Sequence, residues 1–183
     1  GAKVRVFVRY TSSGRLGNLE LLTKETLEKI EIIRGDLRNL DGVKRAVNGT
    51  EVIFHLGALI SIPYSYIDPR DFIDTNVIGT LNILKAAQEC NVEKIIVTST
   101  SEVYGTAITS PISEDHPLQA QSPYAASKIS ADKIAESFYR TYKLPIAIVR
   151  PFNTYGPRQS MRAIIPAIIY QALKGNKLNI GSL

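Results

Sequence analysis

The chain has 183 residues, 44% of them hydrophobic, which suits one globular domain or most of one. No apolar run approaches the roughly 18 residues of a membrane span, and no secretory leader is recognisable, so the cytoplasm is predicted. The net charge of +5 comes from scattered basic residues without interleaved aromatics, which disfavours a nucleic-acid-binding protein. The single cysteine, Cys90, cannot form an internal disulfide and is expected to pack at the end of an apolar helix.

Strands and helices alternate along the chain, which predicts an α/β fold with a doubly wound parallel sheet. Strands are predicted at residues 3–9, 30–34, 52–56, 94–99 and 145–150. Helices are predicted at Leu40–Val47, 72–89, 124–142 and Ile164–Leu173. Glycines 14 and 17 follow the first strand without a convincing helix behind them, so we expect a surface turn there.

One spacing in the helix at 124–142 carries chemistry. Tyr124-Ala-Ala-Ser-Lys128 places a phenol and an ammonium four residues apart, on the same helix face. A tyrosine with a pKa of about 10 is a poor base at neutral pH, and a nearby lysine favours its phenolate. Because this spacing is common by chance, it needs support from other residues.

That support comes from the strand at 94–99, which runs into Thr100, Ser101 and Glu102. In an open parallel sheet, ligands bind beyond the carboxyl ends of the strands. These hydroxyls and this carboxylate therefore lie where chemistry is expected.

Further segments complete a pattern that resembles the extended short-chain dehydrogenase/reductases, specifically the NAD-dependent nucleotide-sugar epimerase/dehydratase family. They are Gly35-Asp-Leu37, Val52 to Ala58, Asn76 to Thr80 and Arg150 to Arg158. The resemblance implies a Rossmann-like dinucleotide-binding domain over residues 1–160 and the start of the substrate-binding region at 161–183. No G-x-x-G-x-x-G turn occurs, so a first unit of roughly 30 residues is expected upstream, and the isolated fragment is expected to be inactive.

The resemblance implies NAD as the cofactor, with NADP as the alternative because no acid follows Arg9 at the end of its strand. Asp36 matches the carboxylate that binds the adenine amino group, with helix capping as the alternative. Asn76 matches a buried asparagine that ties the central strands together. The implied cofactor-binding residues are Arg9, Asp36, Leu37, Leu56, Gly57, Ala58, Asn76, Thr98, Tyr124, Lys128 and Pro151.

The catalytic residues implied are Thr100, Glu102, Tyr124 and Lys128. Tyr124 would take the C4-hydroxyl proton, with Thr100 orienting that hydroxyl, and a partly buried Glu102 would remove the C5 proton. A glutamate at position 102 favours a 4,6-dehydratase, with a 4-epimerase, a UDP-glucuronate decarboxylase or a non-catalytic dinucleotide-binding protein as alternatives.

The longer sequence segments around these motifs resemble those of N-acetylglucosamine-type nucleotide-sugar 4,6-dehydratases. dTDP-glucose dehydratases, by contrast, carry aspartate where this chain has Ser101. The partner implied is a nucleotide-diphosphate sugar, with substrate contacts from Ser61, Ser101, Asn153 and Arg162 and no metal. A homodimer is also expected, because the helices at 72–89 and 124–142 carry apolar residues beyond one face. These residues are Ile78, Leu81, Ile129 and Phe138.

Overall fold

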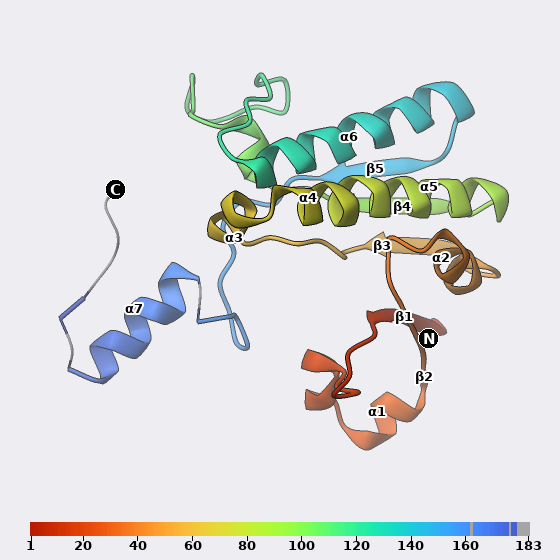
Figure 1. Cartoon of the computed structure of the whole chain (residues 1–183), viewed down its shortest axis with the longest axis horizontal. Helices are drawn as coiled ribbons and strands as arrows, with labels where there is room; N and C mark the ends of the chain where they lie inside the picture. The colour runs from red at the N-terminus through yellow and green to blue at the C-terminus, as the bar shows by residue number, and fades with distance from the viewer. Residues whose placement is uncertain (162, 176, 179–183) are drawn as a thin grey trace. The chain divides into compact units, whose positions relative to one another are not determined.

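The computed structural model describes residues 1–161, 163–175 and 177–178, which fall into two compact units, Gly1–Phe152 and Asn153–Leu183. The first unit holds parallel strands with flanking helices, a Rossmann-like arrangement (Figure 1). The strands are β1 (Val4–Arg9), β2 (Ile30–Gly35), β3 (Val52–His55), β4 (Lys94–Thr98) and β5 (Ile146–Val149). Every predicted strand is confirmed, and its ends differ by at most one residue from the prediction.

The strands form two parallel sheets in the described residues. β1 pairs with β2, and β4 lies between β3 and β5. In a complete doubly wound sheet the first strand lies between the second and the fourth, and here β1 and β3 take the places of the second and fourth. The split between β1 and β3 therefore lies where the first strand is expected.

Most helices also match the prediction. In the first unit they are η1 (Gly17–Leu21), α1 (Lys24–Glu28), α2 (Leu40–Val47), α3 (Ile62–Ile67), α4 (Pro69–Phe72), α5 (Gly79–Glu89), η3 (Ser101–Tyr104) and α6 (Pro123–Tyr142). The long helix expected at 72–89 instead runs from α4 through a π-helical segment, η2 (Ile73–Ile78), into α5. The four unpredicted helices, η1, α1, α3 and η3, are too short for hydrophobic periodicity to reveal them. The surface turn is confirmed by the positive φ angles of Gly14 and Gly17, although η1 begins at Gly17.

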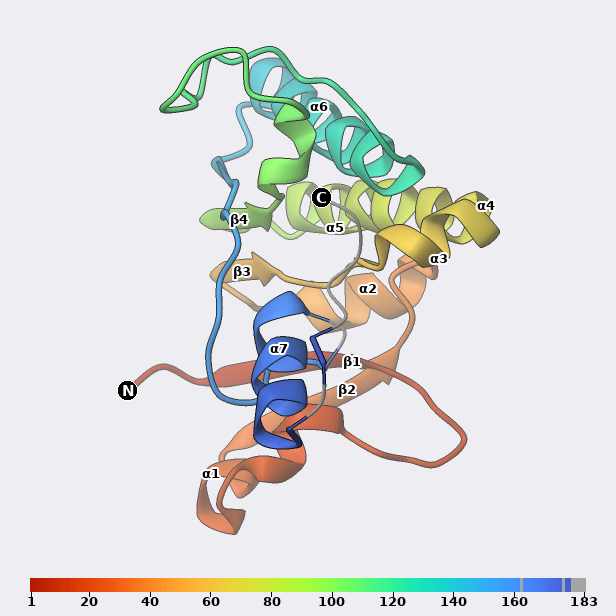
Figure 2. The same cartoon turned by 90° about the vertical axis from the view of Figure 1, so that its left-hand side faces the viewer.

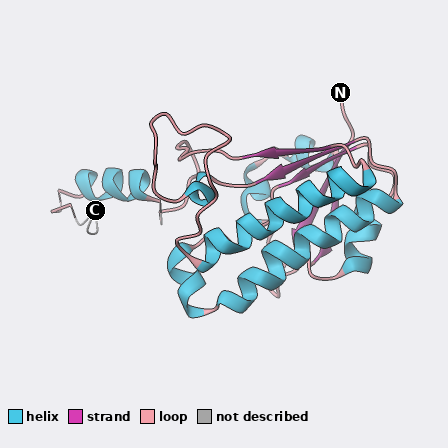
Figure 3. Cartoon of the chain, turned by 90° about the horizontal axis from the view of Figure 1, so that it is seen from above, coloured by secondary structure: helices cyan, strands magenta, loops and turns pink. Residues whose placement is uncertain are grey.

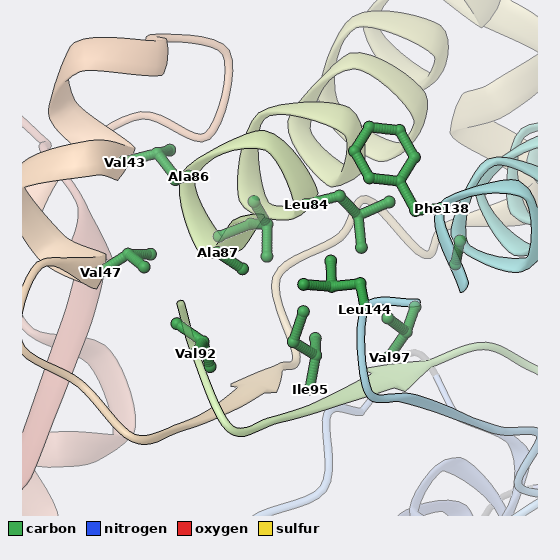
Figure 4. Packing of buried hydrophobic residues seen from close by; sticks show 12 residues of the cluster. Val43, Val47, Leu84, Ala86, Ala87, Val92, Ile95, Val97, Phe138 and Leu144 are labelled. Atoms are coloured by element: carbon green, nitrogen blue, oxygen red, sulfur yellow. The ribbon is translucent and has the colours of Figure 1, made fainter. Parts of the chain in front are cut away.

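The core lies between the β3–β5 sheet and the two long helices. α5 and α6 lie side by side across one face of this sheet, and α2 packs against α5 (Figures 1 and 3). Val43 and Val47 of α2, Leu84 of α5, and Ile95 and Val97 of β4 meet in this layer (Figure 4). Cys90 packs against the same cluster, as expected.

The opposite face of the β3–β5 sheet is much more open. Ile95 and Val97 point to the helices and are fully buried, whereas Phe54 of β3 is 67% exposed. Strand residues alternate between faces, so this contrast marks one covered and one uncovered face within the first unit (Figure 2).

The second unit contains α7 (Ile164–Leu173), as predicted. The boundary at residue 160 between a dinucleotide-binding domain and a substrate-binding region stays a prediction. The structure separates its two compact units after Phe152. None of the helices in the described part of the chain combines the length and apolar character that a bilayer crossing requires.

Candidate functional site

The first turn of α6 presents the tyrosine of the predicted site. Ser122 caps this helix, its side chain accepting a hydrogen bond from the Ala125 amide at 3.0 Å, and Pro123 occupies the first position. Such a cap and proline favour a helix that starts here. Tyr124 and Lys128 are both buried, at 6% and 4% exposure. The sequence thus places both groups inside the protein at a sharply defined helix start.

Lys128 reaches the end of the neighbouring strand. Its Nζ donates a hydrogen bond to the Thr98 carbonyl oxygen at 2.7 Å. Burial lowers the pKa of Lys128, and the negative charge of Asp132 partly offsets that effect. The ammonium is therefore fixed to β4 at the point where the hydroxyl cluster begins.

The phenol of Tyr124 behaves differently from what the lysine alone predicts. Burial raises the pKa of Tyr124, its hydrogen bond with Thr100 lowers it, and the charge of Glu102 raises it further. The net direction is upward, so the expectation of a lowered pKa is wrong for this chain by itself. Desolvation disfavours the phenolate more strongly than the groups around it favour it.

The segment after β4 is shaped by a short helix. The Thr100 hydroxyl caps η3 and accepts a hydrogen bond from the Glu102 amide at 3.2 Å. Val103 and Tyr104 turn inward, with exposures of 0% and 3%. Glu102 is consequently exposed, so the predicted partial burial is wrong for the described chain.

Both the oxygen and the nitrogen of the Asn76 side-chain amide form hydrogen bonds within the protein. Its Oδ1 accepts from the Leu59 amide at 2.8 Å, and its Nδ2 donates to the Leu59 carbonyl and to Ser127 Oγ, both at 2.9 Å. Asn76 therefore ties the loop after β3 to α6, and the expected tie between strands is wrong in that detail. It lies in the π-helical segment, a feature often found near functional sites.

His55 is a site residue that the sequence reasoning missed. It ends β3 with 5% exposure, and its Nε2 lies 2.9 Å from Thr80 Oγ1. The Thr80 hydroxyl donates to the Asn76 carbonyl at 2.6 Å, so the imidazole is the donor to Thr80. Burial, together with the positive charge of Lys128, lowers the pKa of His55 to about 4. A polar residue at an inward-facing strand position was the available signal.

Asp36 follows β2 and is held by a neighbouring arginine. Its Oδ2 lies 2.6 Å from Arg38 Nη2, and this hydrogen bond is the main reason that its pKa is lowered. Asn39 caps α2, accepting from the Gly42 amide at 3.0 Å. The helix-capping alternative for Asp36 is therefore wrong. Arg9 ends β1 beside it, and its charge also lowers the pKa of Asp36.

Leu37 occupies the space that two glycines leave free. A Cβ at Gly57 would lie 2.6 Å from Leu37 Cδ1, and one at Gly79 would lie 2.9 Å from Leu37 Cβ. The small size of Gly57 thus makes room for Leu37. Leu56 beside it is 73% exposed at the carboxyl end of β3.

The remaining predicted contacts are spread over loops. Ser61 caps α3, accepting from the Tyr64 amide at 3.4 Å, and the Ser101 amide donates to the Pro151 carbonyl at 3.0 Å. Ala58 is half-buried and Pro151 exposed. Asn153 is the first residue of the second unit, and Arg162 lies outside the described residues, so their substrate roles stay predictions. Among the described residues, no group of three or more His, Cys, Asp or Glu side chains could hold a metal.

Comparison with known proteins gives a consistent family. The family model described as GDP-mannose 4,6 dehydratase matches residues 1–183. The human dTDP-D-glucose 4,6-dehydratase is 34% identical over 156 residues, covering 84% of this chain and 44% of that protein. A UDP-glucose 4-epimerase of Mycolicibacterium smegmatis is 38% identical over 167 residues, covering 88% and 52%.

Solved structures agree with these matches. The dTDP-glucose 4,6-dehydratase DesIV of Streptomyces venezuelae, solved with NAD bound, superposes with a TM-score of 0.84 at 32% identity. The match covers 97% of this chain and 55% of that one. The chain spans about half the length of the curated relatives it matches.

Proposed function

Because this chain belongs to the GDP-mannose 4,6-dehydratase family within the NAD-dependent epimerases and dehydratases, we propose that it is the central part of a nucleotide-sugar 4,6-dehydratase. The observation that carries the proposal is the joint placement of Thr100, Tyr124 and Glu102. The threonine hydroxyl bonds the phenol, and the carboxylate is close enough for its charge to act on that phenol. A phenol that can act as the base, an orienting hydroxyl and one carboxylate therefore act on one another.

The residues present fit a dinucleotide. The pairing with Arg38 keeps Asp36 ionised, and one third of its side chain stays exposed, so its carboxylate can accept a hydrogen bond from an adenine amino group. Lys128 provides a cation one helical turn from Tyr124, held against the Thr98 carbonyl at the end of β4. NAD, when bound, would accept a hydride from the sugar and later return it. We propose NAD, with NADP as the alternative.

In the first half of the reaction, Tyr124 accepts the proton of the sugar C4 hydroxyl while Thr100 orients that hydroxyl. The raised pKa of Tyr124 means that its phenolate needs positive charge nearby. Lys128 supplies one such charge from a fixed position. This half leaves a ketone at C4, which acidifies the neighbouring C5 proton.

In the second half, Glu102 removes the C5 proton and water leaves from C6. The exposure of Glu102 in the described chain puts it at the open rim of the site, where a substrate can reach it. Return of the hydride to C6, together with a proton from solvent at C5, would then give the 4-keto-6-deoxy sugar.

A 4-epimerase is the second candidate, because Glu102 is exposed and unburied and an epimerase needs no base at C5. A uronate decarboxylase would also share the first half-reaction. The mass of the product distinguishes the three enzymes. A dehydratase product has lost water, an epimerase product has an unchanged mass, and a decarboxylase product has lost carbon dioxide. A protein that only binds the dinucleotide would form no product.

Glu102→Gln in the full-length protein tests the dehydratase directly. The amide cannot accept the C5 proton, so C4 oxidation should proceed and elimination should stall. Reduced nicotinamide should then accumulate on the enzyme, visible as near-ultraviolet absorbance, while solvent deuterium fails to enter C5. Asp115→Asn, at an exposed carboxylate in the loop before α6, is the matched control and should turn over normally. Normal formation of 4-keto-6-deoxy product by Glu102→Gln would overturn the assignment.

For the substrate, we propose an N-acetylglucosamine-type nucleotide sugar. Ser101 supports this choice, because its position carries aspartate in dTDP-glucose dehydratases. Turnover of UDP-N-acetylglucosamine and dTDP-glucose by the full-length protein should differ by at least about tenfold in favour of the first. A preference for dTDP-glucose would contradict the proposal.

We also propose a homodimer built on α5 and α6. Ile78, the last residue of η2 before α5, is 39% exposed, and Tyr139 and Tyr142 of α6 exceed 50%, so apolar surface remains beyond the core. Phe138, expected in that surface, is buried in the core instead. A monomer in light scattering of the full-length protein at micromolar concentration would contradict the dimer.

A further inference from the structure

We infer that Asp132 is a positioning residue for Lys128, keeping the lysine protonated inside the protein while Arg150 holds the Asp132 carboxylate from its other side. Tyr124, Lys128 and Asp132 follow one another at four-residue intervals along α6, which puts all three on one helix face. The proposed reaction uses the first two and assigns nothing to the third.

Burial creates the need for such a residue. Lys128 is 4% exposed and Asp132 is 1% exposed. A charge in the protein interior is unfavourable unless other charges and hydrogen bonds compensate it. The hydrogen bond from Lys128 goes to the Thr98 carbonyl, which is neutral. The compensating charge comes from Asp132, which raises the pKa of Lys128 against the effect of burial.

The Asp132 carboxylate is itself held in place. Its Oδ2 accepts a hydrogen bond from Arg150 Nε at 2.9 Å. Arg150 in turn donates to the Tyr104 hydroxyl at 3.2 Å, and its guanidinium lies 5.3 Å from the centre of the Tyr104 ring. The other carboxylate oxygen, Oδ1, is buried and has no hydrogen-bond partner among the described residues. Such an oxygen in a native interior needs an explanation, and Asp132 lies one helical turn beyond the buried Lys128 on the same face of α6.

The other titratable groups around Lys128 do not replace Asp132. His55 faces Lys128 from β3, and its pKa of about 4 makes it neutral at physiological pH. Glu102, in η3, acts on Tyr124. Glu114, which lines a cavity of about 410 Å³ together with Arg150, is exposed.

The consequence for catalysis rests on the proposed function, whereas the charge of Lys128 does not. A protonated Lys128 favours the phenolate of Tyr124, and a neutral amine would not. Loss of the Asp132 charge should therefore make the reaction fail at a lower pH than in the wild-type enzyme. A purely structural role for Asp132 would instead lower activity equally at every pH.

The full-length protein labelled with ε-¹³C lysine provides the test. The Lys128 resonance is identified by its loss in Lys128→Met, and its pKa is read from a pH titration. Asp132→Asn should lower that pKa by about one unit or more, and Asp132→Glu should stay near the wild type. Glu136→Gln is the matched control, since this carboxylate of α6 is already bound by Lys133 and Arg140 and should leave the pKa unchanged. An unchanged Lys128 pKa in Asp132→Asn overturns the inference.

Asp132→Asn leaves the half-buried Arg150 without its carboxylate partner, and the variant could fail to fold. The double variant Asp132→Asn with Arg150→Gln replaces the ion pair by two neutral amides, and the same fall in the Lys128 pKa is expected. The alkaline limb of the pH profile of kcat should move down with it. A fall in the Lys128 pKa with an unmoved activity profile would support the role of Asp132 and count against the proposed role of Lys128 in catalysis.

Discussion

The candidate site has a buried half and an exposed half, which differ in how firmly their side chains are held. Tyr124, Lys128 and Asn76 are buried, and hydrogen bonds to neighbouring elements fix Lys128 and Asn76. Glu102 and Leu56, in contrast, are exposed at the carboxyl ends of their strands. In the proposed reaction, the buried half carries the proton transfer at C4, and the exposed half contributes to cofactor and sugar recognition. Apart from Glu102, whose proposed role is chemical, interior residues should therefore show larger effects on mutation than exposed residues.

The largest effect is expected at the centre of the buried half. Tyr124→Phe keeps the ring and its packing but removes the proton acceptor, so turnover by the full-length enzyme should fall by about 10³-fold or more while NAD binding stays nearly unchanged. Tyr139→Phe is the matched control, because this tyrosine of α6 is 55% exposed. Turnover of Tyr124→Phe within tenfold of wild type would remove Tyr124 from the mechanism.

Asn76 should come next, through stability. Asn76→Ala leaves the Leu59 amide and carbonyl and the Ser127 hydroxyl without their partner. Each buried group left unpaired costs about 1–3 kcal/mol, so unfolding in urea should show a loss of roughly 4 kcal/mol. Gln88→Ala changes an exposed amide on α5 and should cost less than about 0.5 kcal/mol. Equal losses of unfolding free energy in the two variants would contradict the larger role given to the buried amide.

His55 should make stability depend on pH. Its pKa of about 4 in the folded protein lies below its ordinary value of 6.5, so the unfolded chain binds a proton that the folded chain does not in that interval. The stabilisation is complete above pH 6.5 and is lost as the pH falls towards 4. Between pH 7.5 and 5, the wild-type protein should lose about 2 kcal/mol more than His55→Gln in urea unfolding. A parallel loss in both proteins would show that His55 is not buried as a neutral group.

The smallest effect is expected in the exposed half. Asp36→Asn keeps the shape of the side chain and weakens a partly solvated hydrogen bond, so the Kd for NAD should rise by about tenfold or less. Asp41→Asn, an exposed residue of α2, should leave the Kd unchanged. A loss of NAD binding well beyond tenfold would mean that the adenine end of the site is as tightly built as the catalytic end.

The sequence predicted the strands and long helices because their periodicity extends over enough residues to be read. Short helices such as α3 were missed, since a single cap like Ser61 carries too little signal. The site residues near Tyr124 were predicted from motifs, but the exposure of Glu102 and the raised pKa of Tyr124 were not. Both depend on which neighbours desolvate or repel a group, and only the folded chain determines that.

The packing of Leu37 sets a limit on sequence drift at two positions. At Gly57 an added methyl group would meet the tip of the Leu37 side chain, which can turn aside. At Gly79 the methyl group would meet Leu37 at its Cβ, where only a backbone shift gives room. Alanine is thus an acceptable replacement at the first position and a costly one at the second, so the two glycines differ in how freely descendants of this chain can lose them.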